Sequence, residues 1–146
     1  MSNDYNALIP LINSFERLGR MADAERLRRR EKEVLERQLQ QFPDDVRARI
    51  LLAADLANLG QPEDAVLHVR IAVAMRPTDS NVLYNAACTY GCLAMKADAL
   101  EMFRRCIKSG YSNARWAMND PDLKILHDDP EFKSLLAAKS SDAPAR

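Results

Sequence analysis

The sequence has little of what sheets and turn-rich folds require. Among its 146 residues there are only four glycines, and aromatic residues make up 6%. Alanine, leucine, arginine and glutamate are abundant instead, and these side chains lose little conformational freedom in a helix. Hydrophobic residues make up 47% of the chain, which is enough for a continuous core. The composition therefore predicts one all-α domain of ordinary size.

An excess of charge of either sign is also missing. Twenty-one basic residues balance twenty-one acidic ones, so no net field attracts a polyanion, and we expect no nucleic acid as partner. No apolar run approaches the roughly 20 residues that span a bilayer. Residues 1–13 lack the order of basic and then apolar residues that marks a signal peptide. We therefore expect no membrane insertion, and any anchor would lie outside this chain.

Cysteines are few and irregularly placed. Cys88, Cys92 and Cys106 form an odd set without the spacing of a secreted disulfide scaffold, which favours reduced thiols and a cytoplasmic location. Cys88 and Cys92 are four residues apart on one helix face, and with Cys106 and His68 they offer soft metal ligands. Cysteine also serves as a small apolar core residue, and no CxxC or paired-histidine spacing accompanies these three. We therefore expect no metal and no cofactor.

A repeat with a period of about 34 residues is the strongest positive signal. Pro43 and Pro77 stand one period apart, and each closes a helical pattern. At the same offset, similar residue types recur: Arg49, Leu52, Ala53, Leu56, Ala65, Val69, Ala72 and Pro77 reappear as Leu83, Ala86, Ala87, Tyr90, Ala99, Phe103, Cys106 and Tyr111. Apolar residues three and four apart mark one helix face, and breaks near Leu59-Gly60 and Ala94-Met95 start a second helix. Each copy is therefore predicted to be a helix hairpin.

An earlier, longer copy precedes these two. Its first helix keeps the apolar spacing through Leu8, Leu11, Ile12 and Phe15. The stretch from Ala24 to Pro43 is longer than the stretch from Ala65 to Pro77 by about two helical turns. Such an insertion rotates the face by only about 20°, which keeps the buried side. We predict a long helix from about Ala22 to Gln41. Its basic run from Arg26 to Lys32 is interleaved with glutamates, which favours an exposed, salt-bridged face.

A closing segment follows Tyr111, where the repeat stops. Asp120-Pro121 and Asp129-Pro130 each offer a capping carboxylate followed by proline at the first helical position, so two short helices are predicted to begin there. Six apolar side chains then supply a face that covers the last hairpin: Trp116, Leu123, Leu126, Phe132, Leu135 and Leu136.

These residues together resemble the tetratricopeptide repeat (TPR) family. The segment from Asp120 to Leu136 is similar to the ends of TPR regions at the C-termini of bacterial signalling proteins, including kinases and class III adenylate cyclases. The resemblance implies an all-α, right-handed TPR-like superhelix of three antiparallel helix pairs with a short C-terminal helical cap. We expect one domain over residues 1–146, with repeats at 5–43, 46–79 and 80–111, capping helices at 112–138 and a disordered tail at 139–146.

The resemblance also implies a function, because in this family the first helices line a groove that holds a peptide or protein segment. Residues at the corresponding positions here are Asn6, Ile9, Asn13, Arg17, Arg47, Ile50, Leu51, Ala54, Asn58, Asn81, Tyr84, Asn85, Cys88 and Cys92. We therefore expect a protein-protein interaction module, part of a larger bacterial signalling or regulatory protein.

The alternative is a self-association module that forms a homo-oligomer through the long helix or the uncapped first hairpin. An enzyme is not expected. His127 lies beside Asp128 and Asp129, but no nucleophile or glycine-rich loop accompanies them, so no catalytic residue is assigned.

Overall fold

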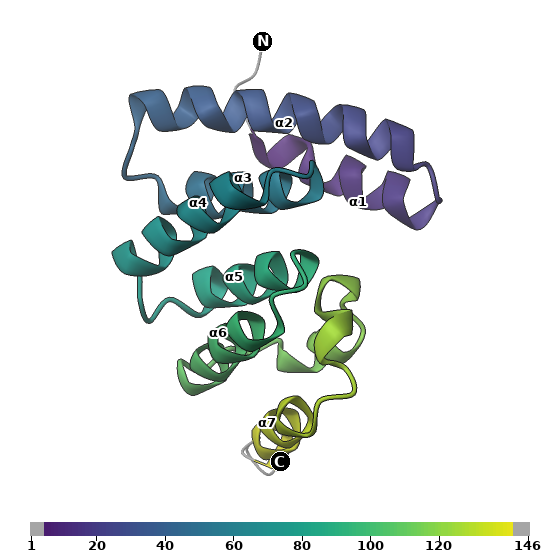
Figure 1. Ribbon diagram of the computed structural model, residues 1–146, viewed down its shortest axis with the longest axis vertical. Helices are drawn as coiled ribbons and strands as arrows, with labels where there is room; N and C mark the ends of the chain where they lie inside the picture. The colour runs from purple at the N-terminus through teal and green to yellow at the C-terminus, as the bar shows by residue number, and fades with distance from the viewer. Residues whose placement is uncertain (1–4, 142–146) are drawn as a thin grey trace. The chain divides into compact units, whose positions relative to one another are not determined.

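The structure is a computed structural model that describes residues 5–141, and within that range it contains helices and no strand. The predicted all-α class is thereby confirmed. The elements follow one another as η1 (Tyr5–Ala7), α1 (Ile9–Arg17), α2 (Met21–Gln41), α3 (Val46–Asn58), α4 (Pro62–Met75), α5 (Ser80–Cys92), α6 (Lys96–Lys108), η2 (Ala114–Met118), η3 (Pro121–Leu126) and α7 (Pro130–Ser141), where η denotes a 3-10 helix (Figure 1).

The chain forms two compact units, residues 1–72 and residues 73–146. The first unit holds η1 to α3 and most of α4, and the second holds α5, α6 and the closing segment. The single TPR domain and its superhelix remain predictions.

The helices begin and end at the spacing that the sequence repeat predicts. The first and last residues of α3 and α5 are each one repeat period apart, as are the first residues of α4 and α6. Asp45 and Asp79 precede α3 and α5, and their carboxylates accept hydrogen bonds from Ala48 N at 2.9 Å and Asn81 N at 2.9 Å. An aspartate at this position satisfies backbone donors that the helix leaves unpaired, so the same local signal starts both helices.

The turn between the two helices of a hairpin is also repeated. Gly60 has φ +76° and Ala94 has φ +58°, the left-handed conformation that ends many helices. The next residue then bonds back across the turn, from Gln61 N to Leu56 O and from Met95 N to Tyr90 O, each at 2.9 Å. Both turns are therefore Schellman motifs, and they lie at the two breaks predicted from the sequence.

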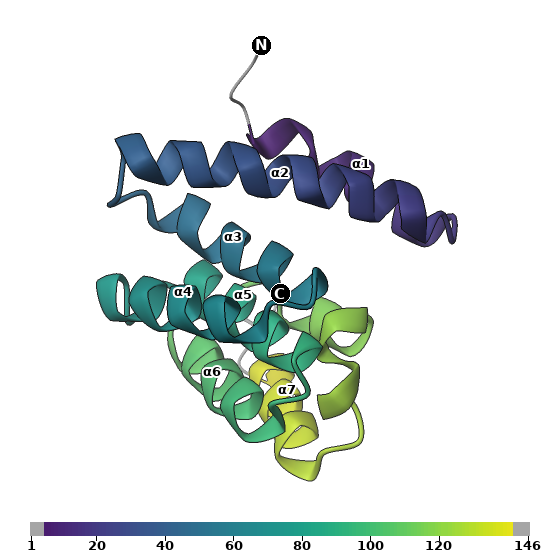
Figure 2. The same ribbon diagram turned by 45° about the horizontal axis from the view of Figure 1, so that its top comes forward.

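Helix α2 matches the predicted long helix to within one residue at its start. Figure 1 and Figure 2 show that α1 lies alongside the N-terminal part of α2. The exposed side of α2 carries the ion pairs Glu25–Arg29 at 2.7 Å and Lys32–Glu36 at 3.6 Å. These pairs confirm the predicted salt-bridged face, except that Glu31, which belongs to the same run, is buried.

The core of the first unit forms where α1 and α3 pack on α2. Ile12 of α1, Leu35 of α2 and Leu52 of α3 are buried. Pro10 stands in the first turn of α1, where its missing N–H breaks no helical hydrogen bond.

The second unit is built on the α5–α6 hairpin, which η3 and α7 contact. Leu123, Leu126 and Phe132 are fully buried, and the Phe132 ring lies 4.7 Å from the Phe103 ring of α6. As predicted, Asp120 and Asp129 cap η3 and α7.

Two details of the closing segment differ from the sequence prediction. Trp116 is exposed rather than part of the covering face, because Ala114 and Ala117 supply the buried side of η2. Helix α7 continues to Ser141, into the stretch predicted as a tail, and residues 142–146 lie outside the described residues. None of the helices in residues 5–141 combines the length and the apolar character needed to cross a lipid bilayer.

Candidate functional site

Four residues predicted to line a groove form one row along α3, which we call the α3 row. Arg47, Leu51, Ala54 and Asn58 are four, three and four residues apart, so they share one helix face. Arg47 and Asn58 are exposed and the other two are half-buried, whereas Ile50 of the same helix is buried in the core. The α3 row therefore offers a mixed polar and apolar surface within the first unit.

Hydrogen bonds fix the two polar ends of the α3 row. Arg47 Nε and Nη2 donate to Asn6 Oδ1 at 3.1 and 2.9 Å, and Asn58 Nδ2 donates to Ala54 O at 2.9 Å. Of the other predicted residues of this unit, Asn13 and Arg17 are exposed on α1 and Ile9 is half-buried.

The corresponding row on α5, one repeat later, has different surroundings. Asn81 and Cys92 are exposed and Asn85 is half-buried, but Cys88 and the neighbouring Tyr84 are buried. Tyr84 stacks on Tyr111 with ring centroids 4.6 Å apart. Residues of the η3 segment contact this side of α5, so Tyr84 and Cys88 are engaged within the unit.

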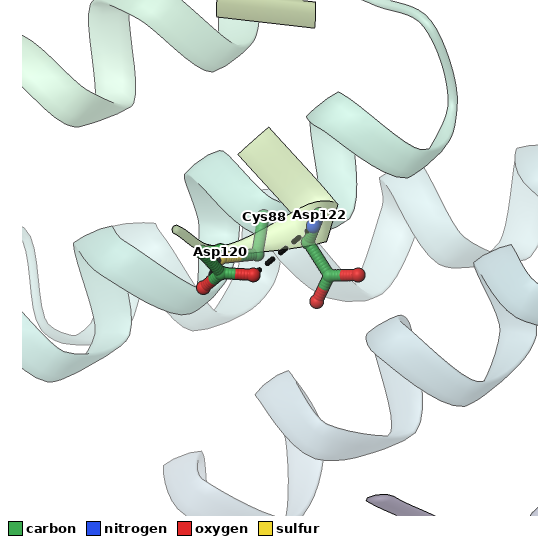
Figure 3. Close-up of side chains that lie close together, drawn as sticks. All are labelled: Cys88, Asp120 and Asp122. Carbon is green, nitrogen blue, oxygen red and sulfur yellow. Dashed lines mark hydrogen bonds between the residues drawn. The ribbon is translucent and has the colours of Figure 1, made fainter. Parts of the chain in front are cut away.

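Asp120, at the start of η3, joins these side chains. Its Oδ2 atom accepts hydrogen bonds from Tyr84 Oη at 2.7 Å and from Cys88 Sγ at 3.6 Å. Its Oδ1 atom accepts from Asp122 N at 3.0 Å (Figure 3). Cys92 Sγ donates to Asp122 Oδ1 at 3.4 Å. Two thiols from α5 and two carboxylates from η3 therefore meet in what we call the Cys-Asp cluster.

Burial determines the protonation of Cys88 and of the neighbouring Tyr84. It raises the pKa of Cys88 well above its ordinary value, and the charges of Asp120 and Asp122 act in the same direction. Burial also raises the pKa of Tyr84, with a further contribution from Cys88 and Asp120. Without a bound cation, both groups therefore keep their protons at neutral pH and donate to the Asp120 carboxylate.

Gly91 allows the close approach of η3 to α5. A Cβ atom on Gly91 would lie 2.2 Å from Asp122 O and 3.8 Å from Leu123 Cδ2. No real side chain fits at the first distance, so this position requires glycine while η3 stays in place.

A second buried polar group lies in the first unit, between α2 and α3. Asp55 and Glu31 are 1% and 4% exposed, and one buried carboxyl oxygen of each, Asp55 Oδ2 and Glu31 Oε1, has no hydrogen-bond partner among the described residues. Arg28 Nη1 lies 3.4 Å from Asp55 Oδ1, and Arg28 also pairs with Glu16. Burial raises the pKa of Asp55 to about 8; the Glu31 charge adds to the shift and Arg28 opposes it. The two acids therefore share one proton at neutral pH.

An open cavity of about 300 Å³ lies beside the C-terminal half of α2 in the same unit. Arg49 is one of the residues that line it. The Nη1 atom of Arg49 lies 3.1 Å from His68 Nδ1, and its Nη2 atom donates to Pro43 O at 2.8 Å. Burial lowers the pKa of His68, and the Arg49 charge adds to that effect, so a neutral His68 accepts from the guanidinium. The lining residues are Glu36, Leu39, Gln40, Arg49, Leu52 and His68.

The remaining candidates considered from the sequence do not meet in one place. Cys106 Sγ donates to Ser80 O at 3.3 Å in the core of the second unit, and His68 belongs to the first unit. His127 Nε2 lies 3.0 Å from Ala117 O, to which it donates, and its ring packs against Phe132.

Sequence reasoning missed the acid pair and the second role of Asp120. A signal for the first was available, because Asp55 falls in the buried face of α3 and its repeat equivalent, Thr89, is also polar and buried. Asp120 was predicted as a cap, but its contact with Tyr84 joins residues 36 positions apart, which no local pattern indicates.

Comparisons with known proteins give a partial similarity. No family model matches this chain. The chain is 31% identical over 80 residues to a chloroplastic protein from Arabidopsis thaliana. The match covers 53% of this chain and 24% of the relative, so the chain spans about a quarter of the length of the curated relative it matches. A match of this extent does not establish membership of a family.

Proposed function

We propose that this chain is a protein-interaction module that binds a peptide or protein segment along the first helices of its hairpins. The α3 row carries the proposal. A half-buried Leu51 between an exposed Arg47 and an exposed Asn58 combines an apolar contact with groups that bond a peptide backbone. The resemblance to TPR proteins, in which first helices bind peptides, adds support.

On α5 the proposed surface is narrower than the sequence suggests. Asn81 and Asn85 are the polar groups that α5 itself offers, since both are at least partly exposed. Tyr84 and Cys88 contribute by holding η3 instead of touching a partner, because their polar atoms bond to Asp120. A variant of Tyr84 would therefore report on folding as well as on binding.

We also infer a setting for the module. The similarity of residues 120–136 to the ends of bacterial signalling proteins supports a place within a larger regulatory protein of the cytoplasm. In that setting the chain performs no catalysis itself and supplies the contact with a partner.

Peptides selected from a random phage-displayed library test this proposal. Calorimetry with a selected peptide should give an affinity at least about tenfold weaker for the double variant Leu51→Ser, Asn58→Ala, as expected when contact residues are truncated. Both side chains are partly exposed, so the melting temperature should change little.

Leu67→Ser is the matched control, because Leu67 is an exposed leucine on α4 of the same unit. The control should bind the peptide as the wild type does. The proposal is wrong if no peptide is enriched, if the double variant binds equally well, or if Leu67→Ser loses as much affinity.

A second candidate function, self-association, is favoured by an apolar surface at the α1–α2 turn. Leu11, Leu18 and Met21 are 50%, 71% and 59% exposed, and Leu11 and Leu18 are two helical turns apart. Several exposed apolar side chains in one short stretch of chain are typical of association surfaces. The exposed side of α2 is charged and ion-paired, so the turn is the better candidate for a contact between copies of this chain.

Light scattering over a range of concentrations tests self-association. The wild type should change from monomer to dimer as concentration rises, and Leu11→Gln with Leu18→Gln should stay monomeric. Phe42→Gln, at an exposed phenylalanine beyond the other end of α2, should dimerise like the wild type. A wild type that is monomeric throughout would rule out this second candidate.

A further inference from the structure

We propose that Cys88, Cys92, Asp120 and Asp122 bind one Zn²⁺ ion between α5 and η3. The inference does not depend on the proposed function, since it concerns only the Cys-Asp cluster of the second unit. Two elements contribute two ligands each, which is a common way to build a structural zinc site.

The spacing of the donor atoms fits a tetrahedral ion. Zinc bonds of about 2.0–2.3 Å place neighbouring ligand atoms about 3.3–3.8 Å apart in a tetrahedron. Cys88 Sγ lies 3.6 Å from Asp120 Oδ2, and Cys92 Sγ lies 3.4 Å from Asp122 Oδ1. One ligand atom each from Cys88, Asp120 and Asp122 lies within 4.8 Å of the others. Cys92 Sγ lies outside that group of three, so the Cys92 side chain must rotate for the four donors to meet at one ion.

The positions on α5 also suit shared ligation. Cys88 and Cys92 are one helical turn apart, so their side chains project from the same side of α5. Each thiol already points its proton at one of the two carboxylates. A cation takes the place of the two thiol protons, which pass to the buffer, and it joins the same pairs of atoms.

The ligand types select the metal. Thiolates with carboxylates suit Zn²⁺, which is borderline-soft and accepts four ligands. Calcium and magnesium require six or more oxygen ligands or several waters, and two sulfur donors do not meet that requirement. Cadmium and cobalt accept the same set of ligands and make it visible by spectroscopy.

Tyr84 holds one of the carboxylates in position. Its hydroxyl donates to Asp120 at 2.7 Å, and the Asp122 N–H binds the other oxygen of that carboxylate at 3.0 Å. Partners of this kind orient metal ligands and strengthen binding. Cys92 and Asp122 are exposed, which gives the ion a path from solvent into the site.

Binding would link α5 to η3 through the ion. Because the ion binds the folded second unit, its presence should raise the melting temperature of that unit. The metal would then hold the closing segment on α5, in addition to the buried side chains of Leu123 and Leu126.

Titration of the purified, reduced chain with Zn²⁺ alone, in competition with a chromogenic chelator, tests the proposal. We expect one ion per chain. Cobalt should give the ligand-field and thiolate charge-transfer bands of a tetrahedral site with sulfur ligands. Two substitutions at exposed ligands, Cys92→Ser and Asp122→Asn, should leave the fold intact and weaken Zn²⁺ binding at least about tenfold. Tyr84→Phe should weaken it about 10- to 100-fold, as is usual when a supporting hydrogen bond is removed.

Cys106→Ala and Asp128→Asn serve as controls, because Cys106 lies outside the cluster and Asp128 is a carboxylate of the same closing segment. Both should bind Zn²⁺ as the wild type does. The proposal fails if binding is not stoichiometric, or if Cys106→Ala removes it. It also fails if Cys92→Ser loses binding while Asp122→Asn retains it, since the Asp122 carboxylate is then not a ligand.

Discussion

Asp55→Asn is expected to remove most of the pH dependence of stability in the first unit. In the wild type the free energy of unfolding should fall by on the order of a few kcal/mol between about pH 5 and about pH 9. The variant should show a much smaller fall. It should therefore be less affected by alkaline conditions than the wild type, even though it lacks a charged group that pairs with Arg28.

The sign follows from where the proton resides. Burial raises the pKa of Asp55 from its ordinary 3.8 to about 8, so between these values the folded chain keeps a proton that the unfolded chain releases. Stability falls with pH wherever the folded state binds more protons. The contribution is therefore fully present below about pH 4, declines through the neutral range, and is lost above about pH 8.

The surroundings of Asp55 explain why the loss is large. Above its pKa, two carboxylates that are 1% and 4% exposed face each other between α2 and α3. Arg28 is the cation that faces them, and it is shared with Glu16 of α1. An asparagine at position 55 stays neutral, donates to Glu31, and still offers an oxygen to Arg28.

Urea unfolding at several pH values, followed by circular dichroism, measures this effect. Hydrogen exchange in α2 and α3 assigns the change to the first unit. Glu33→Gln is the control, because the Glu33 side chain is exposed on α2. It should leave the pH profile unchanged. Equal pH profiles for the wild type and Asp55→Asn would show that the two acids do not share a buried proton.

The features that the sequence predicted well are those set by neighbouring residues. The breaks near Leu59-Gly60 and Ala94-Met95, and the capping aspartate followed by proline at Asp120 and Asp129, each act within one turn of chain. The two extra turns of α2 could be counted from the spacing of Ala24 and Pro43. These signals fix where each helix begins and ends without reference to the rest of the fold.

The features that the sequence did not predict depend on contacts between distant segments. Cys88 was assigned to a groove because its repeat equivalent, Ala54, lies on the α3 row, and nothing near Cys88 indicates that η3 covers it. The two aspartates of the Cys-Asp cluster follow their cysteine partners by 32 and 30 positions, so no metal-ligand spacing appears in the chain. The expectation that no metal binds rested on cysteine and histidine spacing alone, and the proposed zinc site revises it.

Gly91→Ala is expected to detach η3 from α5 and to destabilise the second unit by about 1–3 kcal/mol, the usual cost of overpacking. Alanine favours a helix over glycine by about 1 kcal/mol, so the local effect alone would stabilise α5. The added Cβ would meet the Asp122 carbonyl oxygen at 2.2 Å, however, and backbone cannot yield as a flexible side chain does. The steric effect should therefore exceed the gain in helix propensity.

The closing segment has little freedom to move away while remaining folded. Leu123 and Leu126 are fully buried, and Asp120 is held by Tyr84, so a displacement of η3 must break these contacts together. We expect the Leu123 amide, which donates to Asp120 O at 3.1 Å, to lose protection from hydrogen exchange. Trp116 fluorescence provides a second readout, because η2 contacts η3.

Gly110→Ala is the control for Gly91→Ala, because it adds backbone strain in the same unit without a steric contact to η3. Gly110 has φ +86° and open space around its Cβ position, so alanine there should cost about 1–2 kcal/mol from the left-handed conformation alone, with Leu123 still protected. Ala94 already adopts such a conformation at φ +58°. If Gly91→Ala leaves Leu123 protected, η3 does not approach α5 as closely as the structure places it. If protection is lost, zinc affinity should fall in the same variant, because Asp120 and Asp122 reach Cys88 and Cys92 only while η3 is in place.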